Sequence, residues 1–244
     1  MEYNTVDDVL RDLEENPVER SGNIYHPIPF PEFSHLKISS NKDVALKKLH
    51  LIEDVLAHLF TDDFKGRKLL DVGANAGLYT FSFAKKGMSV TAFEPHPRYA
   101  PIGSFLAKEK KLDIAWHGIP FDETLVAGQK FDVAIMMSVF QWMAAGEGKM
   151  DRASEQLRYI SEVSSNLVFE LGFNSGKSCI ETKRINHYAE LIKLLQRCTN
   201  YQYYKMIGKT NAWGGRKDRF MVVCSNDEDL NDSSFRKLIR HLHI

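Results

Sequence analysis

The sequence predicts an α/β fold built on a mostly parallel sheet with helices on both faces. Three observations predict it. Apolar runs alternate with helical segments along residues 45–225, a turn of small residues follows the first run, and the last two runs adjoin without a helix between them. Strands that alternate with helices imply right-handed crossovers and a parallel sheet, whereas the adjoining pair predicts a hairpin. Together they predict a doubly wound sheet of seven strands.

Each element follows from its local pattern. Residues 1–17 read as a short amphipathic helix that ends at Pro17. Residues 18–40 contain prolines among aromatic residues and are expected to be ordered but irregular, and residues 41–60 repeat apolar side chains at helical spacing. The expected strands are 67–72, 89–94, 113–118, 131–137, 166–172, 201–207 and 218–225. The expected helices between them are 76–86, 97–110, 151–163 and 186–198, and a last short helix is expected at Ser233–Leu242.

Composition sets the protein class. The chain has 244 residues, of which 43% are hydrophobic and 26% charged, as in ordinary globular proteins. Thirty-two basic residues balance 32 acidic ones, so no overall positive charge attracts nucleic acid or an anionic membrane. The three cysteines are widely spaced, which favours reduced thiols in the cytoplasm over a disulfide framework or a metal site. We expect an N-terminal helix and lid-like extension (1–44), a main domain (45–225) and a C-terminal linker with a short helix (226–244).

One motif carries most of the functional information. An apolar strand ends in Asp71, the turn GANAG follows at residues 73–77, and the next strand ends in Glu94. This order is typical of a nucleoside-binding strand–turn–helix–strand unit, because glycines allow close backbone approach and an acid can accept hydrogen bonds from both ribose hydroxyls. Asn75 and Leu78 stand where a dinucleotide fingerprint needs glycine. Asp71 would repel a pyrophosphate but attract a cationic ligand.

These residues resemble motif I of the class I S-adenosylmethionine-dependent methyltransferases, with Asn75 in place of the middle glycine. The run DVGANAGLYTFSFAKKG with VTAFEPHP is similar to the opening of FkbM-type O-methyltransferases. The segment FDVAIMMSVFQW at 131–142 is similar to the fourth strand and the following loop of small-molecule methyltransferases. The resemblance implies a Rossmann-like fold with an antiparallel edge hairpin and S-adenosylmethionine as cofactor. It implies cofactor contacts at Asp71, Gly73, Ala74, Asn75, Gly77, Glu94, Pro95, Gly118, Ile119, Ser138 and Gln141.

The chemistry expected of such a site is an in-line displacement at the sulfonium methyl. A hydroxyl acceptor benefits from a general base, whereas a phosphate, carboxylate or amine can react without one. The candidate catalytic residues are His117, Glu170 and His187. A lone histidine is more often structural, and Glu170 is equally well interpreted as a partner of a nearby lysine or arginine.

The acceptor is predicted from charge. Basic residues gather in the loops after residue 172 and between the last two strands, which favours a small anionic or carbohydrate-linked acceptor, although solvated loops explain the same pattern. We expect acceptor contacts at Gln141, Trp142, Asn174, Lys177, Arg184 and Arg216, and no metal.

Three other functions stay open. A nucleic-acid methyltransferase is disfavoured by the neutral charge and by Ser138–Gln141, where an Asn/Asp-Pro-Pro-aromatic motif would stand. A noncatalytic module that binds the same nucleoside retains the motif equally well. A nicotinamide-dependent dehydrogenase is disfavoured by the glycine spacing.

Overall fold

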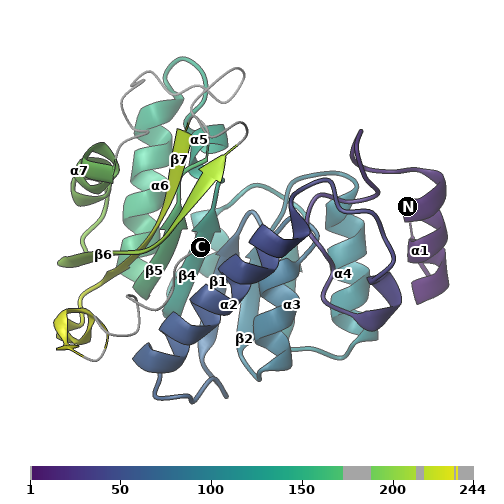
Figure 1. The fold of residues 1–244 in the computed structure, drawn as a ribbon, viewed down its shortest axis with the longest axis horizontal. Coiled ribbons are helices and arrows are strands. Elements are labelled where there is room, and N and C mark those ends of the chain that lie inside the picture. The colour runs from purple at the N-terminus through teal and green to yellow at the C-terminus, as the bar shows by residue number, and fades with distance from the viewer. Residues whose placement is uncertain (1, 173–187, 213–216, 234, 236–244) are drawn as a thin grey trace. The chain divides into compact units, whose positions relative to one another are not determined.

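The computed structural model describes residues 2–172, 188–212, 217–233 and 235 (Figure 1). The strands in these ranges have the order β3-β2-β1-β4-β5-β7-β6, which confirms the predicted sheet of seven strands with an antiparallel pair at one edge. They are β1 (Lys68–Val72), β2 (Ser89–Phe93), β3 (Ile114–His117), β4 (Phe131–Met137), β5 (Ser164–Glu170), β6 (Tyr203–Ala212) and β7 (Lys217–Ser225). The α-helices are α1 (Val6–Glu15), α2 (Lys42–Leu59), α3 (Leu78–Lys85), α4 (Tyr99–Glu109), α5 (Phe140–Met143), α6 (Lys149–Val163) and α7 (Tyr188–Cys198).

The chain divides into two compact units. Unit 1 comprises Met1–His50 and Asp63–Asp122, and unit 2 comprises Leu51–Asp62 and Glu123–Ile244. Helix α2 therefore begins in one unit and ends in the other.

Unit 1 contains the parallel strands β1, β2 and β3 and the helices that connect them. Four of the five residues of β1 are buried, as expected of a parallel strand covered on both faces. Residues 18–40 are irregular, as predicted, and contain a short 3₁₀-helix, η1 (Pro31–Phe33). Together with α1 they pack against α4, beside which α1 lies in Figure 1.

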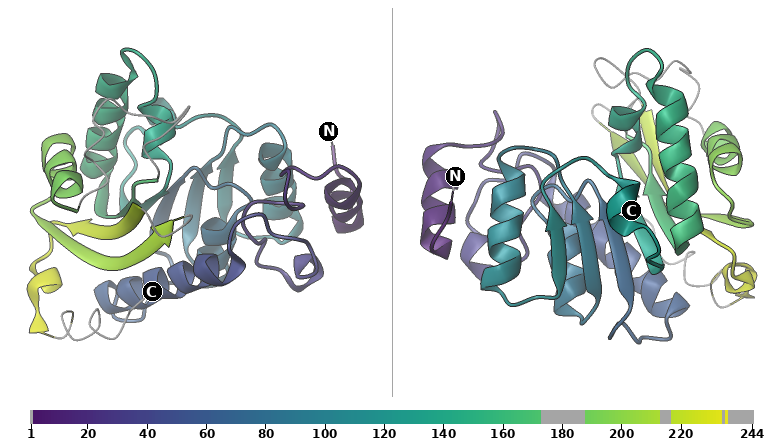
Figure 2. Two further views of the ribbon diagram at one scale, coloured as in Figure 1. Left: turned by 45° about the horizontal axis from the view of Figure 1, so that its top comes forward. Right: turned by 180° about the vertical axis from the view of Figure 1, so that it is seen from behind.

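Unit 2 contains the parallel pair β4–β5, the antiparallel strands β7 and β6, and the helices α5, α6 and α7. Helices α6 and α7 lie side by side in both views of Figure 2. Two expectations need correction here. Strand β6 runs to Ala212, five residues beyond the predicted end at 207, because a register shift between Met206 and Gly208 lets pairing with β7 continue. Residues 140–143, expected to be a loop, form α5.

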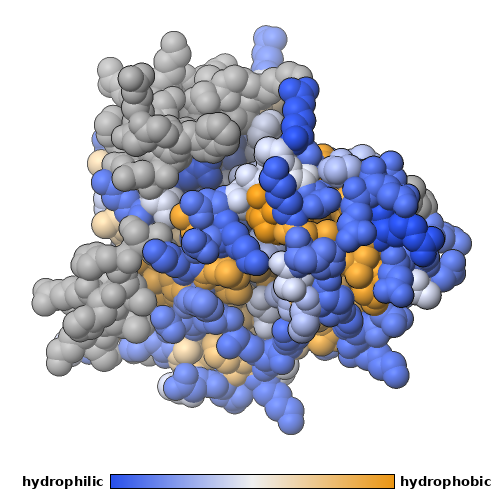
Figure 3. Space-filling model, turned by 45° about the vertical axis from the view of Figure 1, so that its right-hand side comes forward, coloured by the Kyte–Doolittle hydropathy of each residue, from blue (hydrophilic) through white to orange (hydrophobic). Residues whose placement is uncertain are grey.

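The surface is largely hydrophilic on the face drawn in Figure 3, where hydrophobic side chains lie in several separate areas. None of the helices in the described ranges has the length and hydropathy of a membrane span. The predicted helix Ser233–Leu242 falls mostly outside the described residues.

Candidate functional site

The turn between β1 and α3 is built from left-handed backbone. Gly73, Asn75 and Gly77 have φ values of 82°, 52° and 87°. A Cβ atom on Gly77 would lie 2.3 Å from the ring of Phe81, so glycine is required there. Asparagine is one of the few other residues that adopt this conformation readily, which explains why Asn75 can replace the middle glycine of the motif.

Asp71 ends β1 as a buried carboxylate. Its side chain is 1% exposed, and its Oδ2 accepts a hydrogen bond of 2.6 Å from the Thr80 hydroxyl. Burial raises the pKa of Asp71 to about 7; the Thr80 hydroxyl opposes the rise and the charge of Glu94 adds to it. A cationic ligand would relieve this unfavourable burial of negative charge.

Glu94 follows β2 and is 6% exposed. Backbone amides hold both of its oxygens, because the Asn75 N–H donates to Oε2 and the His96 N–H donates to Oε1, each over 2.7 Å. Each carboxylate oxygen accepts more than one hydrogen bond, so the group is oriented and still able to accept from two neighbouring hydroxyls. This geometry fits a ribose diol.

The side chain of Asn75 gives an independent indication of a ligand. Its Oδ1 is buried and has no hydrogen-bond partner among the described residues. A buried acceptor without a partner is costly, and a donor group on a ligand would satisfy it. The residues of this turn therefore fit a nucleoside that carries hydrogen-bond donors and positive charge.

The other cofactor candidates of unit 1 follow β1, β2 and β3. Pro95 and Gly118 are exposed, Ala74 is buried, and Ile119 is 42% exposed. His117 stacks on Phe93, with ring centroids 4.8 Å apart, and burial lowers its pKa. The lowered pKa favours the neutral imidazole, and the backbone oxygen of His117 accepts from the Glu94 N–H over 3.0 Å.

In unit 2 a second network forms where β4 and β5 end. Ser138 has a φ of 58°, its N–H donates to the Glu170 backbone oxygen over 2.7 Å, and its hydroxyl donates to Glu170 Oε1 over 2.6 Å. The Glu170 side chain is 1% exposed, and the same Oε1 lies 3.9 Å from Nη1 of Arg219. Glu170 therefore interacts with both a turn hydroxyl and a cation, which agrees with the alternative interpretation of this residue.

Gln141 connects this turn to the end of β5. Its Nε2 donates to the Ser138 backbone oxygen over 2.5 Å, and its Oε1 accepts from the Gly172 N–H over 3.1 Å. A Cβ atom on Gly172 would lie 2.1 Å from Gln141 Nε2, so a larger residue there would displace the Gln141 amide from these contacts. Trp142, the next residue of α5, is 60% exposed.

Some functional candidates could not be placed. His187, Asn174, Lys177, Arg184 and Arg216 lie outside the described residues. Sequence reasoning overlooked Thr80 and Gly172 as partners. Thr80 carries a usable signal, since it lies in the first turns of the helix that follows the motif, whereas nothing in the sequence marks Gly172 as a partner of Gln141.

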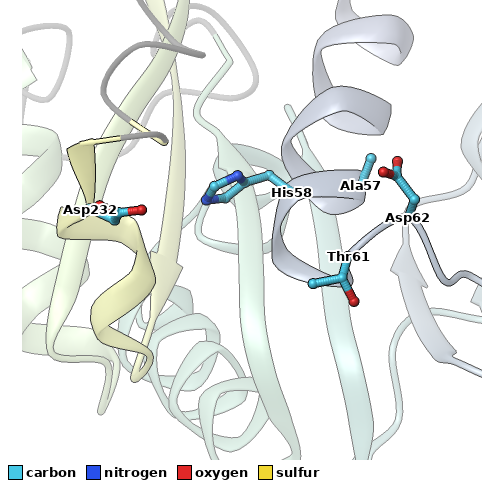
Figure 4. A pocket seen from close by; sticks show the side chains of 5 residues that line it. All are labelled: Ala57, His58, Thr61, Asp62 and Asp232. Atoms are coloured by element: carbon cyan, nitrogen blue, oxygen red, sulfur yellow. The ribbon is translucent and has the colours of Figure 1, made fainter.

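A separate cavity of about 420 Å³ lies in unit 2 (Figure 4) and is lined by Ala57, His58, Thr61, Asp62 and Asp232. None of these residues ends a strand, so the cavity is not where a doubly wound sheet binds its ligand. The described residues contain no group of three or more histidine, cysteine or acidic side chains arranged to hold a metal.

Comparison with known proteins shows what part of the chain resembles. Residues 70–160 match the model of the family described as "Methyltransferase domain". Among curated proteins, a ubiquinone biosynthesis O-methyltransferase of Cereibacter sphaeroides is 31% identical over 81 residues, 33% of each chain, and one of Rhizobium leguminosarum bv. trifolii is 28% identical over 94 residues, 38% of this chain and 37% of the relative. The matched region thus spans about a third of the length of these curated relatives.

Solved structures show the same fold. WbdD is superimposed with a TM-score of 0.70 at 21% identity, covering 89% of this chain and 47% of WbdD. The N-terminal domain of EvdMO1 gives a TM-score of 0.58 at 14% identity, covering 92% of this chain and 97% of that domain. The motif, the strand order and the match over residues 70–160 agree with a methyltransferase domain of the class I S-adenosylmethionine-dependent type.

Proposed function

We propose that the chain binds S-adenosylmethionine and transfers its methyl group to an oxygen atom of a small acceptor that is anionic or linked to a sugar. The observation that carries the proposal is the pair of buried carboxylates, Asp71 and Glu94, at the ends of β1 and β2. Two such acids disfavour a phosphate-bearing cofactor and suit a cationic nucleoside. When bound, S-adenosylmethionine supplies a methyl group on a sulfonium, from which an acceptor oxygen can displace it in line.

The residues of unit 1 serve cofactor binding in this proposal. Glu94 accepts the ribose hydroxyls, because two backbone amides already hold its oxygens in place. Asp71 supplies negative charge near the start of α3, and Asn75 Oδ1 accepts a hydrogen bond from the ligand. Gly73, Ala74 and Gly77 provide close backbone approach, while Pro95, Gly118 and Ile119 line the nucleoside half.

The residues of unit 2 serve the acceptor. We assign Glu170 a positioning role, since it already accepts the Ser138 hydroxyl and lies beside Arg219. It holds Ser138 in its left-handed conformation and orients Arg219, whose charge suits an anionic acceptor. Trp142 is an exposed aromatic surface on the same turn. His117, half-buried and stacked on Phe93, is the weaker candidate for a base, and His187 stays a candidate from sequence.

The relatives support oxygen as the acceptor atom. The curated proteins that match are O-methyltransferases of ubiquinone biosynthesis, and the EvdMO1 domain was crystallised in the presence of S-adenosylhomocysteine (SAH) and D-fucose. Cys198 and Cys224 are free and buried, which supports a cytoplasmic location where thiols stay reduced.

Two measurements test the proposal. Isothermal titration should show binding of S-adenosylmethionine and SAH by the full chain. Incubation with methyl-labelled cofactor and a panel of sugar phosphates, hydroxy acids, phenols and RNA should then yield a labelled small-molecule product. Absence of cofactor binding would contradict the proposal, cofactor binding without any product would favour a noncatalytic module, and labelled RNA would favour a nucleic-acid enzyme.

A further inference from the structure

Residues 18–40 of unit 1 form a rigid segment. The side-chain amide of Asn23 donates to the Leu13 backbone oxygen over 2.9 Å, and its Oδ1 accepts from the Lys37 N–H over 2.9 Å. A Cβ atom on Gly22 would lie 2.7 Å from the Lys37 backbone oxygen, so the two halves of the segment pack closely. The segment is therefore a fixed support for whatever its exposed side chains contact.

Tyr25 is unusual within this support. Apolar side chains on both sides of it are buried: Ile24 is fully buried and Ile28 is 3% exposed, whereas Tyr25 is 37% exposed. Among the described residues of unit 1, the large hydrophobic side chains that are exposed are Tyr25 and Ile119. A large apolar side chain held rigidly at the surface is a candidate for ligand contact.

A chain of contacts connects Tyr25 to Glu94. The Tyr25 N–H donates to the Tyr99 hydroxyl over 2.9 Å, and that hydroxyl donates to Glu19 Oε1 over 3.0 Å. The Tyr99 ring lies 4.9 Å from the ring of His96, whose N–H donates to Glu94 Oε1. The Tyr25 backbone is therefore anchored to the helix that begins five residues after the ribose-binding acid.

Ile119 lies close in sequence to a residue that contacts the backbone of the same glutamate. It lies two residues after His117, whose backbone oxygen accepts from the Glu94 N–H. Both exposed apolar side chains thus belong to segments tied to Glu94. The ring of His26 lies 4.6 Å from that of Tyr25, which extends the aromatic surface.

We propose that Tyr25 and His26 form an outer wall of the nucleoside half of the cofactor site, so that the segment 18–40 takes part in cofactor binding. This inference rests on the proposed function. Tyr25 contributes its aromatic face to the adenosine, and Tyr99 is a positioning residue that acts through the Tyr25 backbone. Aromatic contact with a base is the physical source of the expected affinity.

Titration of SAH into four proteins tests this. Tyr25→Ala should raise the Kd about tenfold, whereas Tyr25→Phe should bind as the wild type does, because the ring is kept. His35→Ala is the matched control, an exposed side chain on the same segment that contacts Glu14. A Kd of Tyr25→Ala within twofold of the wild-type value would overturn the inference alone. Failure of the wild type to bind SAH would overturn the proposed function as well.

Two further readouts complement this titration: one uses a ligand smaller than the whole cofactor, and the other uses the wild type alone and so does not depend on the folding of Tyr25→Ala. Methylthioadenosine lacks the amino-acid half, so its affinity should fall by the same factor in Tyr25→Ala; a loss for SAH alone would place Tyr25 elsewhere and overturn the inference. In the wild type, amide hydrogen exchange in residues 23–28 should slow when SAH is added, and unchanged exchange there with slowed exchange at residues 73–77 would count against it.

Discussion

The turn after β1 and the turn after β4 both contact a buried glutamate, but they do so through different groups. Each places a residue other than glycine in left-handed backbone, Asn75 with φ 52° and Ser138 with φ 58°. Each also contacts a buried glutamate at the carboxyl end of a neighbouring strand. Glu94 is held by two backbone amides, whereas Glu170 is held through a side-chain hydroxyl and an arginine. The first arrangement tolerates many side chains, while the second depends on particular ones.

This difference explains why one turn could be interpreted from sequence and the other could not. A turn that binds through its backbone amides is recognisable from glycines at fixed spacing, and the segment from Asp71 to Glu94 contains such a pattern. A turn that works through side chains leaves residues such as Ser138 and Gln141, which have many other uses. We expect variants of the first turn to lose mainly cofactor affinity and variants of the second turn to lose mainly stability.

The largest expected effect concerns the charge of Asp71. Its pKa is about 7 in the folded protein against an ordinary value of 3.8, so the folded state holds its proton more tightly than the unfolded chain does. Stability is then lost as pH rises from about 4 to about 7, by up to about 4 kcal/mol. Asp71→Asn removes this loss.

Denaturant unfolding of the ligand-free protein at several pH values checks this pH dependence of stability. Asp71→Asn should match the wild type near pH 4 and exceed its free energy of unfolding at pH 8, while cofactor affinity falls. An equal pH dependence of the two proteins would show that Asp71 is not the source of the unfavourable charge.

Glu94→Ala should lower SAH affinity about 100-fold, since hydrogen bonds to a charged acceptor contribute about 1.5–3 kcal/mol each. The two amides that now hold the carboxylate would also lose their acceptor. Glu123→Ala is a suitable control, because Glu123 pairs with Arg152 in unit 2 and does not follow a strand end. Titration would contradict the assignment of Glu94 if both variants bound SAH equally.

Removal of Glu170 should act mainly on stability. Glu170→Ala leaves Arg219 and the Ser138 hydroxyl without this carboxylate, and we expect a loss of about 2–3 kcal/mol in the free energy of unfolding. Glu170→Gln keeps an acceptor for the Ser138 hydroxyl and should lose less. If Glu170 were a general base, the result would differ. Glu170→Gln would fold normally but abolish turnover and remove an ionisation from the pH profile of kcat, and that outcome would contradict a positioning role.

Much of the fold was predictable because it depends on periodic patterns that are local in sequence. Strand β4 was predicted at its observed bounds, since the apolar run 133–137 ends at a polar turn. Strand β6 was predicted too short because its continuation past Gly208 depends on pairing with β7 and not on its own apolar pattern. The contact between Ser138 and Glu170, 32 residues apart, likewise depends on which strands lie side by side.

The smallest expected effect separates the two turns most directly. Asn75→Gly and Ser138→Gly both relieve the strain of a side chain in left-handed backbone, which stabilises the folded state. Both also add chain entropy to the unfolded state, which lowers the free energy of unfolding. At Asn75 the two terms nearly cancel, and the free energy of unfolding should change by about 0.5 kcal/mol or less, because Asn75 Oδ1 has no hydrogen-bond partner among the described residues. At Ser138 the hydroxyl bond to Glu170 is also lost, so a decrease of about 1–2 kcal/mol is expected. Equal changes in denaturant unfolding would mean that the Ser138 hydroxyl adds nothing to its turn, and the contrast between backbone-held and side-chain-held acids would fail.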